Sequence, residues 1–303
     1  MTESPQANAR RPVYRLSLRS WLTLSILGAF LTFLGLVAGS GGLPEINLFP
    51  RSEGITDAHE RVMADAKKLG GEAQVMERNA HFLGQFGDPD RFAFTFKGKT
   101  FDDEALARFI KIYGDRIWGL YLANTGVTDN GLRSLAALSH IETLAIGNLD
   151  PRQRPPSIDL SPSAITDTGL VHLKGLKSLR NLTLGGLPIT DAGLEPLNDL
   201  PNLGGLYLYG TQVRGPGLGW LKSLPALAVL YLDGSAVTDD GLGALKGATN
   251  LQALSLVGVP ISGPGLSHLK ALPKLNWLDV KECKLNFEDI DAFQVACPSV
   301  KLD

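Results

Sequence analysis

A constant interval of 24 residues separates five leucines, and this repeat restricts the fold more than any other feature of the chain. The five are Leu179, Leu203, Leu227, Leu251 and Leu275. Ile117 and Ile141 keep the same spacing upstream. Recurrence at a fixed period of roughly 20 to 50 residues is typical of repeat architectures, in which each unit contacts mainly its neighbours. The chain is therefore predicted to form a stack of similar coils rather than one globular core.

Each repeating unit has two halves with different hydrophobic periods. In the first half apolar residues stand two apart, as in Leu206 and Leu208, which predicts a short strand with one buried face. In the second half leucines recur at every third residue, as in Leu194, Leu197 and Leu200, which predicts a short helical segment with one buried side. Neither half can bury its apolar side alone, so the coils must stack.

Thr-Asp pairs mark the start of the helical half in four units, at Thr128-Asp129, Thr166-Asp167, Thr190-Asp191 and Thr238-Asp239. The hydroxyl can cap free backbone amides and the carboxylate favours the positive end of the helix dipole, so we predict structural roles for both. In six units, including two without the Thr-Asp pair, a glycine stands two residues after the aspartate position, at Gly131, Gly169, Gly193, Gly217, Gly241 and Gly265. Because glycine inside a helix is costly, its recurrence predicts a steric constraint at each coil.

These units resemble the leucine-rich-repeat family. Each has the form L-x-x-L-x-L followed by a pattern close to V-T-D-x-G-L-x-x-L-x-x-L, over about residues 92 to 303. The resemblance implies an α/β solenoid with a parallel β-sheet on the concave face and short helices on the convex face. The inward position that the family fills with Asn holds Thr125, Thr211, Ser235, Val259 and Cys283. In this respect the units are more similar to the cysteine-containing repeats of F-box proteins and to the T-D-x-G-L repeats of bacterial membrane proteins. No F-box precedes the array, so a ubiquitin-ligase role is not implied.

The repeat domain is predicted to have about eight coils and a cap at each end. Residues 92–112 would form a divergent first coil. Residues 44–91 would form a linker and an N-terminal cap, with an amphipathic helix over 55–70 and a strand over 73–77. The C-terminal end would be closed by Phe287, Ile290, Phe293 and Val295. An insertion of roughly fourteen residues, Asp150 to Ser163, would protrude from the second coil as a loop.

An uncharged, apolar segment near the N-terminus predicts a transmembrane helix over residues 20–43, since about 20 apolar residues cross a bilayer core. Four arginines precede it, at Arg10, Arg11, Arg15 and Arg19. The positive-inside rule then places residues 1–19 in the cytoplasm and the repeat domain on the other side, and the repeat style favours the periplasmic side of a bacterial inner membrane. A cleaved secretory signal ending near Ala38 and a buried core helix are the alternatives.

Composition and motifs favour no enzyme. Lys plus Arg number 29 and Asp plus Glu 31, a balance that argues against general binding to nucleic acid or anionic lipid surfaces. Ser267 and Lys270 match the catalytic pattern S-x-x-K, but Val171 and Lys174 occupy the same positions of another unit, so the repeat explains the match. The five histidines show no metal-ligand spacing, and Asp102-Asp103-Glu104 is interpreted as a solvated acidic turn. No catalytic residue, metal, cofactor or small-molecule substrate is predicted.

The strongest site hypothesis is a protein-binding patch on the concave face, where residues between the strand leucines point. That column is Thr95, Tyr121, Ala145, Thr183, Tyr207, Tyr231, Ser255 and Asp279. With strands about 4.8 Å apart, Tyr207 and Tyr231 should be neighbours, and tyrosine is enriched in binding hot spots. The predicted patch consists of Tyr207, Tyr209 and Tyr231 at its centre, Asp233 beside them, and Tyr121 and Trp277 farther along. The alternatives are that these rings only stabilise the sheet, and that the array is a self-associating structural component.

Cys283 and Cys297 lie close together at the C-terminal end. The family resemblance implies a disulfide between them as part of a terminal cap, if the domain lies in an oxidising compartment. Two separately buried thiols remain the default expectation.

Overall fold

The computed structural model describes residues 64–65, 67–69, 72–77, 92–147 and 164–303. By its internal contacts the chain divides into two units, Met1–Ser52 and Glu53–Asp303, and every described residue belongs to the second. The predicted transmembrane segment, the inserted loop and most of the predicted N-terminal helix lie outside the described residues. Within the described part of the chain, no helix is both long and apolar enough to span a membrane.

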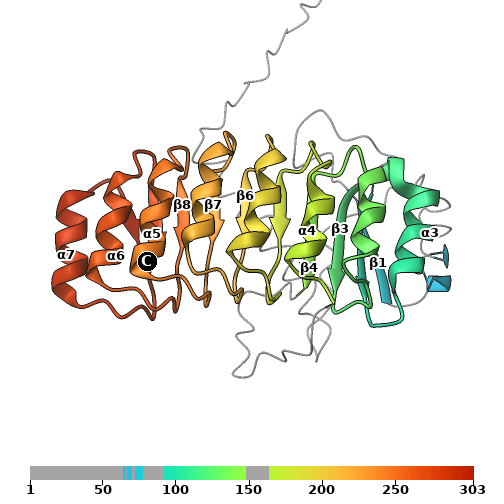
Figure 1. The fold of residues 1–303 in the computed structure, drawn as a ribbon, viewed down its shortest axis with the longest axis horizontal. Coiled ribbons are helices and arrows are strands. Elements are labelled where there is room, and N and C mark those ends of the chain that lie inside the picture. The colour runs from blue at the N-terminus through green and yellow to red at the C-terminus, as the bar shows by residue number, and fades with distance from the viewer. Residues whose placement is uncertain (1–63, 66, 70–71, 78–91, 148–163) are drawn as a thin grey trace, which may run out of the picture. The chain divides into compact units, whose positions relative to one another are not determined.

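The described strands form one sheet in chain order, as the colours from blue to red in Figure 1 show. β1 pairs with β2 in antiparallel orientation and every later neighbour is parallel. The strands are β1 (Glu72–Glu77), β2 (Phe92–Lys97), β3 (Ile117–Ala123), β4 (Thr143–Gly147), β5 (Asn181–Thr183), β6 (Gly205–Tyr207), β7 (Val229–Tyr231), β8 (Ala253–Ser255), β9 (Trp277–Asp279) and β10 (Lys301–Leu302). The predicted parallel sheet is confirmed, and β2 to β9 each open one coil.

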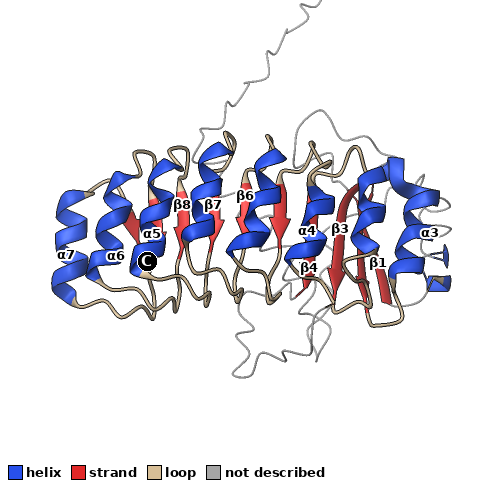
Figure 2. Ribbon diagram, viewed as in Figure 1, coloured by secondary structure: helices blue, strands red, loops and turns tan. Residues whose placement is uncertain are grey.

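Helical segments form a layer over one face of the sheet (Figure 2). They are α3 (Asp103–Tyr113), η1 (Gly114–Arg116), η2 (Gly131–Ala137), α4 (Asp167–Leu170), η3 (Val171–Leu173), η4 (Asp191–Asp199), η5 (Pro216–Ser223), α5 (Asp239–Gly243), η6 (Ala244–Gly247), α6 (Gly263–His268), η7 (Leu269–Ala271) and α7 (Phe287–Ala296). Those labelled η are 3₁₀ helices. A leucine at every third residue matches the three-residue turn of a 3₁₀ helix, which keeps these leucines on one side.

The core runs without interruption between sheet and helices. Leu194 and Leu197 of η4 and Leu206 of β6 are fully buried in it. The first coil fills the same space with aromatic rings: Phe109 lies 4.7 Å from Phe94 and 4.8 Å from Phe96, centroid to centroid. Such edge-to-face contacts add stability beyond buried area. The prediction of a divergent first coil at residues 92–112 is confirmed.

The C-terminal end is closed less completely than predicted. Phe293 of α7 is buried and Ile290 is half-buried, but Phe287 is 82% exposed and Val295 76% exposed. The prediction is therefore wrong for two of the four residues. Successive helical residues are turned by about 100°, so Val295 lies nearly opposite Phe293 and cannot share its buried side.

Thr-Asp pairs link successive coils. The threonines cap their own helices as predicted, for example the Thr190 hydroxyl, which accepts from the Ala192 N–H at 3.3 Å. Each aspartate instead reaches forward: Asp167 accepts from the N–H and the hydroxyl of Thr190, at 2.8 and 2.5 Å. Asp103 binds Thr128 in the same way, at 2.7 and 2.6 Å, so its interpretation as a solvated turn residue is wrong. We call this series of contacts the Thr-Asp ladder.

Candidate functional site on the outer sheet face

The predicted column of outward residues is aligned across the sheet. Thr95 of β2 stands opposite Tyr121 of β3, and the register continues through Ala145, Thr183, Tyr207, Tyr231, Ser255 and Asp279. The constant repeat length keeps each position of one strand beside the same position of the next. The neighbouring placement of Tyr207 and Tyr231 is thus confirmed.

Three aromatic side chains form a continuous row on this face. The ring centroids of Tyr207 and Tyr231 are 5.2 Å apart with planes at 40°. Those of Tyr231 and Trp277 are 6.0 Å apart at 29°. All three residues are part-buried, so part of each remains accessible to solvent. We call Tyr207, Tyr231 and Trp277 the aromatic row.

Small residues make room for the row. Trp277 is not in the tyrosine column: it stands opposite Ala253 of β8, which in turn stands opposite Val229. The short side chain of Ala253 leaves the space across which Tyr231 and Trp277 meet. At Gly205, an added Cβ would lie 3.1 Å from Cε2 of Tyr207, so the Tyr207 ring folds back over this glycine. The row therefore depends on the small residues beneath it.

Two residues that were predicted to belong to the patch, Tyr209 and Tyr121, do not join the aromatic row. Tyr209 is only 7% exposed, so it offers little area to a partner. Tyr121 is part-buried on β3, separated from Tyr207 by the strands that carry Ala145 and Thr183. Burial and, to a lesser extent, the nearby Tyr207 raise the pKa of Tyr121 to about 12. The structure thus brings Tyr207, Tyr231 and Trp277 together and leaves Tyr209 outside the exposed surface.

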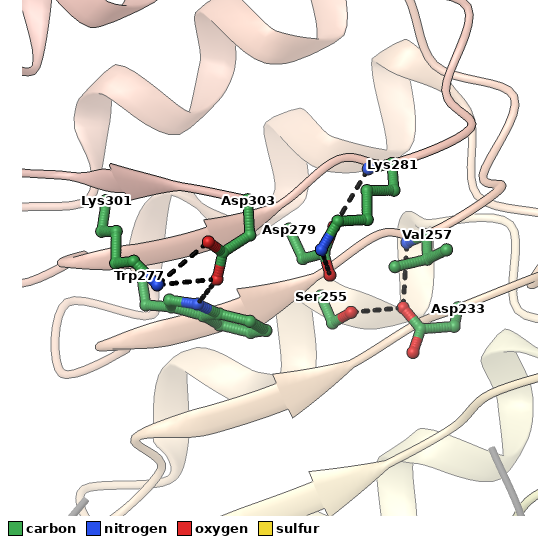
Figure 3. Close-up of polar contacts among 8 residues, drawn as sticks. All are labelled: Asp233, Ser255, Val257, Trp277, Asp279, Lys281, Lys301 and Asp303. Carbon is green, nitrogen blue, oxygen red and sulfur yellow. Dashed lines mark hydrogen bonds and ion pairs between the residues drawn. The ribbon is translucent and has the colours of Figure 1, made fainter. Parts of the chain in front are cut away.

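The carboxylates of Asp233 and Asp279 interact electrostatically with Tyr231 of the row. Figure 3 shows the polar contacts of both carboxylates and of Trp277. Asp233 Oδ1 accepts from the Ser255 hydroxyl at 2.5 Å and from the Val257 N–H at 2.9 Å. Asp279 accepts from the backbone N–H of Lys281 at 3.0 Å, and the Lys281 ammonium lies 3.4 Å from its other oxygen. These bonds fix the two carboxylates at the ends of β7 and β9.

Trp277 is held by a residue that the sequence did not single out. Its indole Nε1–H donates to Asp303 Oδ2 at 2.6 Å, and the Lys301 ammonium lies 2.9 Å from Asp303 Oδ1 (Figure 3). The bonds from Lys301 and then Trp277 lower the pKa of Asp303. The sequence did contain one indication of this contact: the apolar Val300, followed by Lys301 and Asp303 two residues apart, suggests one more short strand beside β9. β10 does pair with β9 at Trp277.

The electrostatics of the row favour neutral tyrosines. Burial raises the pKa of Tyr207, and burial followed by Tyr207, Asp233 and Asp279 raises that of Tyr231. Both phenols therefore stay protonated at neutral pH and can donate hydrogen bonds. Half-buried rings with a polar end suit recognition of another protein. Among the residues that the structure describes, no group of three His, Cys, Asp or Glu side chains is placed to hold a metal ion.

Cys283 and Cys297 are free thiols, each part-buried against the core. Cys283 occupies the inward position of its coil, and its Sγ–H donates to the Leu256 carbonyl at 3.1 Å. Burial is the main reason that the pKa of this thiol rises to about 11. A protonated, hydrogen-bonded thiol is a weak nucleophile.

Comparison with solved structures includes a likeness to an internalin. Internalin C2 from Listeria monocytogenes is 22% identical, with 71% of this chain and 81% of that chain covered and a TM-score of 0.46. At this low similarity, the evidence for the fold is the strand register and the helix layer described above. No protein-family model matches the chain, and no curated protein sequence matches it.

Proposed function

We propose that this chain binds another protein through the outer sheet face, centred on the aromatic row. The observation that carries the proposal is the contact of Tyr231 with Tyr207 on one side and Trp277 on the other. Tyrosine and tryptophan present large, rigid surfaces at low entropic cost, and they dominate measured hot spots. The hydroxyls and the flanking Asp233 and Asp279 supply directional polar contacts around an apolar centre, as in the rim of protein interfaces.

We also propose that the array is displayed from a membrane, on the grounds of the uncharged segment over residues 20–43 and the arginines before it. The repeat domain would then stand on the non-cytoplasmic side. Protease protection of the full-length chain in sealed vesicles tests this separately from partner binding. Digestion of the repeat domain from the cytoplasmic side would contradict it.

Site-specific photocrosslinking in cells tests the binding proposal. A photoreactive residue at position 231 should give a crosslink to one defined protein, whereas the same residue at position 220 should not. Trp220 is a suitable control because it is 44% exposed and belongs to η5 of the helix layer. With the partner purified, Tyr207→Ala, Tyr231→Ala and Trp277→Ala should each weaken binding by about tenfold or more, and Trp220→Ala should leave it unchanged. Equal crosslinking from both positions would contradict the proposal.

Self-association is the second candidate function, and the exposed Phe287 and Val295 on α7 favour it. Exposed apolar residues at the end of a stack offer a place for another copy. In this case photoreactive residues on α7 would give crosslinks between copies of the chain, and position 231 would give none. The two candidate functions therefore predict opposite patterns.

A further inference from the structure

The near balance of charges over the whole chain conceals their separation onto two edges of the repeat domain. In five consecutive coils, the turns that lead from a helix to the next strand contain seven Lys or Arg and one acidic residue, Asp199. Taken together with the last two residues of η4, η5, η6 and η7, these turns are residues 174–180, 198–204, 222–228, 246–252 and 270–276, and we call them the basic rim. Its cations are Lys174, Lys177, Arg180, Lys222, Lys246, Lys270 and Lys274. All seven are exposed.

Contacts between coils make the basic rim one continuous edge. Each coil from 174 to 274 is joined to the next by a hydrogen bond within these turns: Asn202 Nδ2 to the Lys177 carbonyl (2.8 Å), Ser223 Oγ to Asn198 Oδ1 (2.8 Å), Asn250 Nδ2 to the Pro225 carbonyl (3.0 Å) and Lys274 Nζ to Asn250 Oδ1 (2.6 Å). The Cβ of Lys222 also lies against Gly247, the neighbour of Lys246. The cations therefore follow one another along a line.

The opposite edge carries the reverse charge. The turns that lead from a strand to its helix, taken together with the first helix residues, are residues 185–191, 209–216, 233–240, 257–264 and 281–289. They contain seven Asp or Glu and three Lys or Arg. Lysine near a helix C-terminus favours the dipole, which accounts in part for Lys222 and Lys246. The dipole does not account for Lys274 or for the presence of only one carboxylate, Asp199, in the five rim segments.

Four rim lysines form no ion pair with another described residue. Among the residues that the structure describes, no ion pair joins Lys174, Lys222, Lys246 or Lys270 to a carboxylate. The one arginine of the rim, Arg180, lies 3.8 Å from Glu142. Flexible lysines in a row act as separate point charges, whereas recognition of a defined phosphate or base usually uses the planar fork of arginine. A line of separate positive charges is complementary to a partner whose negative charge is distributed over a surface.

We propose that the basic rim lies against the anionic phospholipid headgroups of a bilayer. Lysines near an anionic membrane surface each add attraction that falls off within a Debye length. The same chain carries the segment over residues 20–43 that the sequence predicts to span a membrane, so such a surface would be close to the repeat domain. The proposal does not rest on protein binding by the aromatic row.

Amine footprinting of the full-length chain tests the proposal. The protein is reconstituted with vesicles of phosphatidylcholine alone or mixed with phosphatidylglycerol, and lysine acetylation is followed by mass spectrometry. Rim lysines should react about tenfold more slowly on the anionic vesicles at low salt, and the difference should vanish at high salt. Lys281 and Lys284 on the opposite edge are internal controls and should react alike on both vesicles. Equal rates for the rim lysines on both vesicles would overturn the proposal.

A variant separates the lipid surface from other polyanions. In K174Q/K222Q/K246Q/K270Q, Lys177 and Lys274 should lose their protection on anionic vesicles, whereas K281Q/K284Q should keep it. A soluble DNA oligonucleotide added without vesicles should protect the wild-type rim weakly. Protection by the oligonucleotide but not by phosphatidylglycerol would assign the rim to nucleic acid and overturn the lipid proposal.

Discussion

Asp129 and Thr166 are joined by two hydrogen bonds between successive coils: the N–H and the hydroxyl of Thr166 each donate to one carboxylate oxygen at 2.7 Å. The Thr-Asp ladder repeats this relationship, and it is interrupted where Gly215 replaces the aspartate. There the Thr238 N–H donates to the Arg214 carbonyl at 3.2 Å instead. Adjacent coils are therefore held by a polar contact at the helix starts in addition to the leucine core.

Removing one aspartate should weaken the stack measurably. Asp167→Ala deletes both bonds to Thr190 and should lower the free energy of unfolding by about 2 kcal/mol, the range for bonds to a charged group, reduced by partial exposure. Asp240→Ala is the control, since Asp240 is exposed in the first turn of α5, and it should change stability by about 0.5 kcal/mol or less. Urea unfolding followed by circular dichroism measures both, and equal effects would contradict the role of the ladder.

The ladder also explains the recurring glycine. A Cβ at Gly169 would lie 2.3 Å from Oδ1 of Asp129, whereas a Cβ at Gly175 would have nothing within 4 Å. Gly169→Ala should therefore destabilise the protein by about 1 to 3 kcal/mol, because the carboxylate must leave its place. Gly175→Ala should be neutral or slightly stabilising, since alanine lowers the entropy of the unfolded chain. The two melting temperatures, compared by calorimetry, should differ in this order, and a stable Gly169→Ala variant would refute the steric explanation.

The sequence predicted the features that follow from the constant repeat length, and missed those that depend on individual side-chain positions. The alignment of Tyr207 with Tyr231 follows from in-register stacking of equal coils. The contact of Trp277 with Tyr231 depends on the small Ala253 between their strands, which a column of outward residues does not reveal. Tyr209 is buried, although the alternation of β6 would place it outward, and nothing in the sequence indicated this.

The forward reach of the aspartates was also beyond the sequence. The capping pattern Thr-Asp is local, and it explains why the threonine caps its own helix, but not why its hydroxyl also binds the aspartate of the preceding coil. The partner of Asp129 is 37 residues away, across the insertion in the second coil. Only the stacking of the coils brings the two together, so spacing along the chain carried no signal. The recurring glycines did indicate steric crowding at these positions. The sequence could not show which atom an added Cβ would meet.

Two hydroxyls at the same inward position should respond differently to removal. The Thr211 hydroxyl donates to the Leu208 carbonyl at 2.7 Å, whereas the buried Ser235 hydroxyl has no hydrogen-bond partner within the described structure. Thr211→Val should cost about 1 kcal/mol of unfolding free energy for the lost bond. Ser235→Ala should be neutral or stabilising, because it removes a buried hydroxyl that forms no hydrogen bond within the described structure. Chemical denaturation compares the two, and a larger loss for Ser235→Ala would contradict this account.

Cys283 should make the protein less stable at alkaline pH. Burial is the main reason that its pKa rises from 9.0 to about 11, so the folded state holds the thiol proton where the unfolded state releases it. The contribution of this group is complete below pH 9 and is lost as the pH rises toward 11. Cys283→Ala should show a smaller fall in melting temperature over this range than the wild type. In a Cys297→Ser background, alkylation of the native Cys283 thiol should stay slow up to about pH 10 and then accelerate, and rapid alkylation at pH 8 would show that the thiol is not held in its protonated form.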